Sequence, residues 1–157
     1  MAKFFSMITG LTHLHSSFRY VVLLLLVLAI IDAVISIAGD KTYRKQSKML
    51  ALFALIFSHI QLLMGSVLYF LGNRGAFASL LEGASTMSNP EARFFAVEHM
   101  LAMIVAIALI TVGYSRSKKQ EVDKKKYASI LMFYSIALLL IFVMIPWPFM
   151  KDFGRWF

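Results

Sequence analysis

A small set of polar side chains stands inside stretches of sequence that are otherwise apolar enough for lipid. The stretch LIFSHIQLLMGSVLYFL, residues 55–71, carries His59 and Gln61. Ionisable groups are costly inside a membrane, tend to face the interior of a helix bundle, and mark functional positions. The residues of interest are His15, Arg19, Asp32, His59, Gln61, Glu98 and His99.

Two of these histidines predict a haem site. Neutral imidazole is a standard axial ligand of haem iron, and helix bundles build such sites from facing helices. His59 lies about 12 residues from the outer end of its stretch, or ~18 Å by helix rise. His99 lies ~8 to ~14 Å along its own helix, depending on where lipid begins. A small difference in level would let His59 and His99 ligate one iron, whereas a large difference would not.

Cationic side chains near the same ends could hold the haem propionates. Arg19 and Arg93 both lie near the predicted outer ends of their helices. His15 lies one turn before Arg19 on the same helix face and is the reserve ligand. The sequence therefore predicts a cofactor site made from His59, His99, Arg19 and Arg93, with His15 in reserve.

Other readings of the same residues remain open. A histidine or glutamine in a span often only forms hydrogen bonds between helices. Zinc is disfavoured because it needs three or four close ligands, and no His-x₃-His or His-x₂-Glu spacing occurs. A quinone is a further candidate, since its site needs a histidine, a carboxylate and an aromatic slot. The absence of cysteine excludes thiolate ligation and covalent c-type haem.

The elements that must position these residues are four apolar blocks, in a chain of 157 residues that is 60% hydrophobic. A helix of about 20 residues crosses a ~30 Å hydrocarbon core, and a spanning segment must satisfy its own backbone hydrogen bonds. The sequence predicts an all-α integral membrane protein, with residues 1–157 forming a single domain. Its architecture would be an up-down-up-down bundle of four transmembrane helices, over residues 17–38, 49–71, 94–114 and 127–149.

Local signals refine these helices. The first is expected to begin near Thr12, after Gly10. Asn89 and Pro90 form a helix-start signal, and Pro146 and Pro148 in IPWPF end the last helix. Small residues allow close helix packing in lipid, and one face of the third helix carries Ala92, Phe95, His99, Ala102, Ala106, Ile110 and Gly113.

The net charge of +8 is concentrated in two loops. Ten of the 16 Lys and Arg residues lie in 39–48 and in the stretch SRSKKQEVDKKK. By the positive-inside rule both loops face the cytoplasm, which places both termini in the periplasm if the membrane is a bacterial inner membrane. We expect these loops to meet lipid head groups rather than nucleic acid.

Four stretches together carry a resemblance: LHSSFRY, SHIQLLMGSVLYF, RFFAVEHMLAMIVAIALITVGYSRSKK and IPWPF. They resemble a family of short four-span membrane proteins from Bacteroidetes-type bacteria that are usually labelled cytochrome b. The resemblance points at His15, Arg19, His59, Gln61, Arg93, Glu98 and His99. It implies haem binding, without the paired histidines of two-haem cytochromes.

Two functions follow as hypotheses. The first is a b-type haem protein that transfers electrons near the periplasmic half of the membrane. The alternative is a cofactor-free accessory subunit of a larger respiratory or secretion complex, or a homo-oligomer in the bilayer. Either reading makes the chain an electron carrier or a complex subunit rather than a stand-alone enzyme, and no catalytic residue is assigned.

Overall fold

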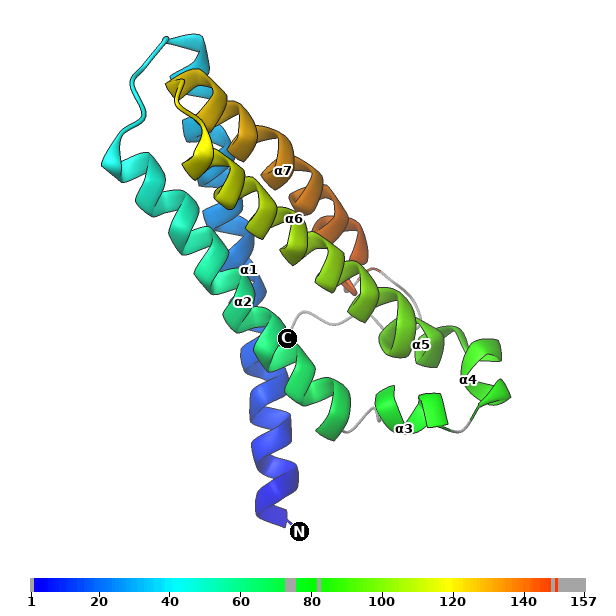
Figure 1. Ribbon diagram of the computed structural model, residues 1–157. Helices are drawn as coiled ribbons and strands as arrows, with labels where there is room; N and C mark the ends of the chain where they lie inside the picture. Colours follow the sequence, from blue (N-terminus) through cyan, green and yellow to red (C-terminus); the bar gives the residue numbers. More distant parts are fainter. Residues whose placement is uncertain (1, 73–75, 82, 148, 150–157) are drawn as a thin grey trace.

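The computed structural model describes residues 2–72, 76–81, 83–147 and 149, and the regular structure within them is helical. Figure 1 shows the arrangement. The elements are α1 (Ala2–Ala38), α2 (Lys45–Leu71), α3 (Ala76–Leu81), α4 (Ala84–Ser88), α5 (Pro90–Arg93), the π-helical turn η1 (Phe94–Glu98), α6 (His99–Lys119) and α7 (Asp123–Met144).

Four helical stretches are long and apolar enough to cross a membrane: α1, α2, the continuous run from α5 through η1 to α6, and α7. The shortest, α7, has 22 residues and so extends about 33 Å. Large apolar side chains such as Leu24, Leu63 and Leu139 are more than half exposed around the bundle, as contact with lipid tails requires. The predicted all-α, four-span integral membrane fold is confirmed.

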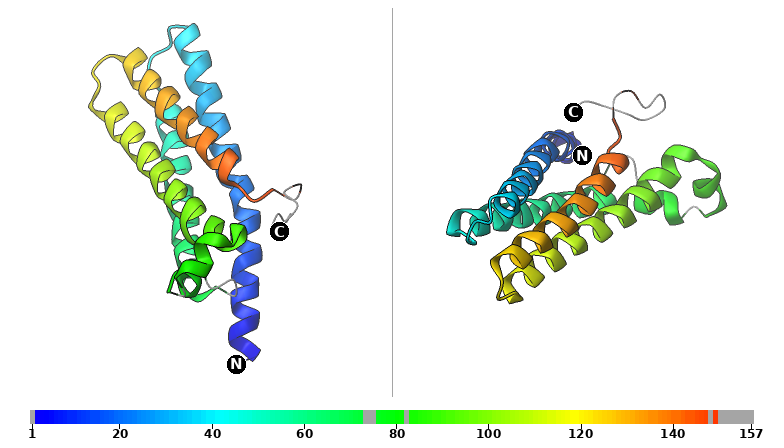
Figure 2. Two further views of the ribbon diagram at one scale, coloured as in Figure 1. Left: turned by 90° about the vertical axis from the view of Figure 1, so that its right-hand side faces the viewer. Right: turned by 90° about the horizontal axis from the view of Figure 1, so that it is seen from above.

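The four long helices form a ring in which chain neighbours run antiparallel. Helix α1 packs against α2 and α7, while α6 packs against α7 and α2, so α1 and α6 lie diagonally opposite each other. Figure 2 shows the same order from two further directions. The predicted up-down-up-down bundle is therefore the observed one, and side chains from α1 and α6 can approach only across its interior.

Small residues on α6 allow the closest helix contact. Ala106, Ile110 and Gly113 are buried against α7. A Cβ atom at Gly113 would lie 2.6 Å from Cβ of Phe133, a distance that real Cβ atoms do not reach. The predicted packing face of the third span is correct from Ala102 onward.

The two basic loops lie together at one end of the bundle, which we call the basic end (Figure 1). The hydroxyl of Tyr127 donates to the carbonyl of Thr42 at 3.0 Å and lies 3.1 Å from Oγ of Ser47. Arg44 in the first loop forms a 2.9 Å ion pair with Asp32 of α1. The side of the membrane that the basic end faces stays a prediction.

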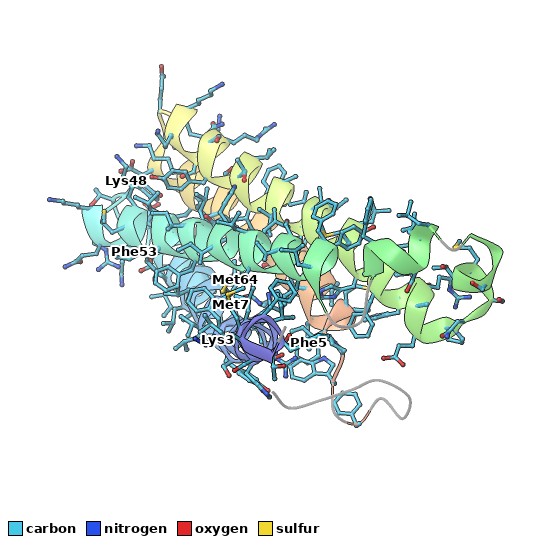
Figure 3. The ribbon with its side chains drawn as sticks, turned by 90° about the horizontal axis from the view of Figure 1, so that it is seen from below. Lys3, Phe5, Met7, Lys48, Phe53 and Met64 are labelled. Atoms are coloured by element: carbon cyan, nitrogen blue, oxygen red, sulfur yellow. The ribbon has the colours of Figure 1, made fainter. Side chains whose placement is uncertain are left out.

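Helix boundaries differ from the prediction at three places. Helix α1 begins at Ala2 rather than near Thr12, because Gly10 has open space around it and is tolerated inside the helix. Figure 3 looks from below, with Lys3, Phe5 and Met7 projecting from this added segment. Helix α6 continues beyond Gly113 to Lys119. The last span covers 123–144 rather than 127–149, since Pro146 disfavours helix in the residue before it.

Candidate functional site

A cavity of about 470 Å³ lies at the end of the bundle opposite the basic end. It is enclosed by the N-terminal half of α1, the C-terminal half of α2, the first turns of α6 and the end of α7. Its volume falls within the ordinary range of small-molecule and cofactor sites. Its polar lining includes His15, Arg19, Gln61, Tyr69 and His99.

His15 reaches the cavity from α1 and packs against a glycine of α2. A Cβ atom at Gly65 would lie 3.1 Å from Cε1 of His15, so the absence of a side chain there makes room for the imidazole. Nδ1 of His15 is buried and has no hydrogen-bond partner among the described residues. The ring is thus held by packing, and Nδ1 has no hydrogen bond among the described residues to offset its burial.

His99 reaches the cavity from the first turn of α6. Its Nδ1 lies 2.7 Å from the carbonyl oxygen of Met144, the last residue of α7. A carbonyl only accepts, so Nδ1 carries the hydrogen and donates it, which leaves the lone pair on Nε2. In a continued helix that carbonyl would accept from the N–H of position 148, but Pro148 has none.

Such a bond between an imidazole and a backbone carbonyl is the usual support of a metal-binding histidine, because it fixes both the tautomer and the ring orientation. The rings of Phe94 and Phe95 also lie near the imidazole of His99, with centroid distances of 5.8 and 6.4 Å. The orientation of His99 is therefore determined by one hydrogen bond and two aromatic neighbours.

A buried cation and an amide complete the polar lining. Arg19 is only 7% exposed, and its guanidinium lies 5.8 Å from the ring centroid of Trp147 and donates to the hydroxyl of Tyr20. Gln61 donates from Nε2 to the carbonyl of His15 at 2.8 Å, while its Oε1 is buried without a hydrogen-bond partner among the described residues. Leaving a buried polar atom unpaired costs about 1–3 kcal/mol, which a ligand in the cavity would offset.

The chemistry of the lining suits one kind of ligand. Imidazoles from diagonally opposite helices, His15 and His99, line one cavity together with the guanidinium of Arg19. No aspartate or glutamate is among the described residues that line it. No cluster of three or more His, Cys, Asp and Glu forms within the described part of the chain. The cavity thus brings two imidazoles and a guanidinium together, and residues of these types could hold a metal cofactor with anionic substituents.

Two of the residues that the sequence predicts to bind the cofactor lie outside the cavity. His59 is exposed on α2, where Nδ1 donates to the carbonyl of Leu55 at 2.9 Å and Nε2 lies 3.5 Å from Oγ1 of Thr111. Arg93 forms a 2.8 Å ion pair with Glu98. The structure brings His15, Arg19, Gln61 and His99 together, and it does not bring His59 or Arg93 to them. Cofactor binding by His59 and Arg93 stays a prediction.

Sequence reasoning missed two supports of this site. Met144 supplies the carbonyl that orients His99, and the signal for it was Pro148, four positions later, which cannot donate to that carbonyl. Gly65 makes room for the imidazole of His15. No pattern in the sequence indicated that particular contact.

Comparisons with protein-family models, with curated proteins and with solved structures give no match for this chain. A four-helix protein with four membrane-length apolar helices is established.

Proposed function

We propose that the protein binds a single haem b in the cavity, with His15 and His99 as the axial ligands, and serves as an electron carrier in the membrane. The observation that carries this proposal is the shared cavity of the two imidazoles, which come from helices that do not pack against each other. When bound, haem supplies one-electron redox chemistry. The protein's own residues orient the ligand and balance its charge.

The two histidines have complementary supports. The bond from Nδ1 of His99 to the carbonyl of Met144 keeps the lone pair of Nε2 available to a metal and makes the imidazole a stronger ligand. His15 is held by its fit against Gly65, and Gln61 anchors the same turn of α1 through the carbonyl of His15. Both rings are therefore oriented before a ligand arrives, which lowers the entropic cost of binding.

The charge of the lining favours carboxylate substituents. The guanidinium of Arg19 is a buried cation, and burying a charge in an apolar span is costly unless an anion is near. Haem carries two propionates, and the guanidinium can hold one of them by paired hydrogen bonds. Met100, Met103 and Ile107 line the remaining wall with apolar surface and keep water from the ligand.

The test is optical. The full chain is expressed with ample haem supply, purified in mild detergent, and examined by a reduced-minus-oxidised absorption spectrum and by haem extraction. An α-band with stoichiometric haem is expected. A folded, colourless protein that yields no haem on extraction contradicts the proposal.

A second candidate is a cofactor-free accessory subunit of a larger membrane complex. One observation favours it: His59 is a polar side chain exposed on the outer surface of a span, and its Nε2 has a long 3.5 Å contact with Oγ1 of Thr111. A neighbouring subunit with a donor group would cover it. Affinity purification separates the two functions, because a stoichiometric partner without haem supports the subunit and a pigmented monomer supports the haem protein.

A further inference from the structure

The π-helical turn η1 directly precedes His99 and changes what surrounds its ring. The backbone N–H of His99 donates to the carbonyl of Phe94, five residues back, instead of four as in an α-helix. In a regular α-helix a residue five positions back lies about 140° around the axis and could not stack on His99. Phe94 is 5% exposed, and its ring centroid lies 5.8 Å from that of the imidazole. The wider turn thus places both Phe94 and Phe95 against the ring.

A side chain from the neighbouring helix reaches the backbone of this turn. Tyr69 of α2 donates its phenolic hydrogen to the carbonyl of Ala96, with a distance of 3.1 Å between the oxygens. Ala96 is the central residue of η1 and is itself buried. Tyr69 and Phe95 also line the cavity, so this bond lies at the cavity wall.

We infer that Tyr69 is a positioning residue for His99, acting through the π-helical turn. The inference rests on the proposed function for its ligand, but its geometry concerns the protein alone. The bond from Tyr69 gives the carbonyl of Ala96 a partner on α2. This bond stabilises a π-helical turn, which is rare in proteins and occurs mainly at functional sites. The turn and the carbonyl of Met144 together set the direction in which Nε2 of His99 points.

Two hydrogen bonds, one with α7 and one with α2, hold His99 in position. Met144 on α7 fixes Nδ1, and Tyr69 on α2 fixes the backbone that carries the ring and its two aromatic neighbours. Helix α6 is thereby tied at His99 to both of the helices that flank it in the ring. Without Tyr69 the turn could relax toward the α-helical register, and Phe94 would leave the imidazole.

The test uses Tyr69→Phe in the full chain, with Tyr134→Phe as a matched control. Tyr134 also donates to a helix carbonyl of α2, that of Ala51 at 2.8 Å, but it does not line the cavity. Hydrogen–deuterium exchange of the haem-free proteins is measured over residues 94–101. Exchange there is expected to rise about threefold to tenfold in Tyr69→Phe and to stay unchanged in Tyr134→Phe.

Haem affinity is the second readout. Loss of a residue that orients a metal ligand lowers affinity about 10–100-fold, so Tyr69→Phe is expected to bind haem at least about tenfold more weakly while the control binds as the parent does. Unchanged exchange over residues 94–101 overturns the positioning role whether or not haem binds. Faster exchange in Tyr69→Phe, together with a parent protein that takes up no haem, supports the role of Tyr69 and overturns the proposed function alone.

Discussion

The two ends of the bundle differ in the polar groups that they bury, although Oγ of Ser36 near the basic end is also buried without a hydrogen-bond partner among the described residues. At the basic end, the hydroxyls of Tyr127, Ser47 and Ser117 are hydrogen-bonded within the protein, and burial raises the pKa of the loop residue Tyr43, which keeps its phenol neutral. At the cavity end, Nδ1 of His15 and Oε1 of Gln61 are buried without such a partner. The proposed ligand would bind at the cavity end, where the unpartnered atoms belong to an imidazole and an amide.

The largest expected effect comes from removing an imidazole of the cavity. His15→Leu and His99→Leu are each expected to lower haem content at least about tenfold, because a lost ligand costs no less than a lost supporting residue. Both proteins should still insert and fold, since leucine is favourable in lipid. Haem content per folded protein is the measurement.

The control for these variants is His59→Leu. His59 lies outside the cavity, and an intramembrane hydrogen bond contributes only about 0.6 kcal/mol on average, so pigment and stability should both be retained. Pigment lost on changing His59 and kept on changing His15 would restore the pair that the sequence predicted.

The choice between His15 and His59 shows which part of a site can be predicted from a sequence. Helix rise gave the depth of His59 and His99, but depth says nothing about rotation around the helix axis. His59 and Gln61 are two positions apart, so they lie about 200° apart around α2, and only Gln61 faces the cavity. The estimate also assumed a regular helix from Pro90, whereas η1 inserts a wider turn before His99.

The fold itself was more predictable than the site. Four apolar blocks specify four spans, and the start at Asn89 is confirmed because its side chain caps the amides of Glu91 and Ala92. These features depend on local chemistry. The site depends on contacts between residues distant in sequence, such as His15 with Gly65 and His99 with Met144. The hydrophobic periodicity of the sequence does not indicate those contacts.

A change in the tightest helix contact should affect stability and leave the ligand alone. Gly113→Ala places a Cβ atom where Phe133 already lies, and overpacking of this kind costs about 1–3 kcal/mol. Thermal denaturation in detergent measures the loss, which should appear with unchanged haem affinity. A large loss of haem affinity in Gly113→Ala would show that the two ends are not independent.

The matched change at the cavity end should lower haem affinity and leave thermal stability nearly unchanged. Gly65→Ala brings a Cβ atom to 3.1 Å from Cε1 of His15, so the imidazole must shift by a few tenths of an ångström. Haem affinity is expected to fall about tenfold, or about 1.4 kcal/mol, with little change in thermal stability. Titration of the haem-free protein with haem measures this. Unchanged affinity would mean that the position of His15 does not matter.

The smallest effect is expected at the ion pair of the basic end. Asp32 and Arg44 form a 2.9 Å contact with side chains 22% and 44% exposed. Pairs with this much exposure contribute about 0–1 kcal/mol, so Asp32→Asn should lower thermal stability slightly, and less so at high salt. Haem content should not change. A loss of haem in this variant would link Asp32 to the distant cavity.

The measurement that most directly tests the central claim is electron paramagnetic resonance of the oxidised, haem-loaded protein. Ligation by both His15 and His99 requires a low-spin ferric signal in the parent, retained in His59→Leu and lost in either His15→Leu or His99→Leu. A high-spin signal in the parent, or a low-spin signal that survives both cavity substitutions, would contradict a haem held between these two helices.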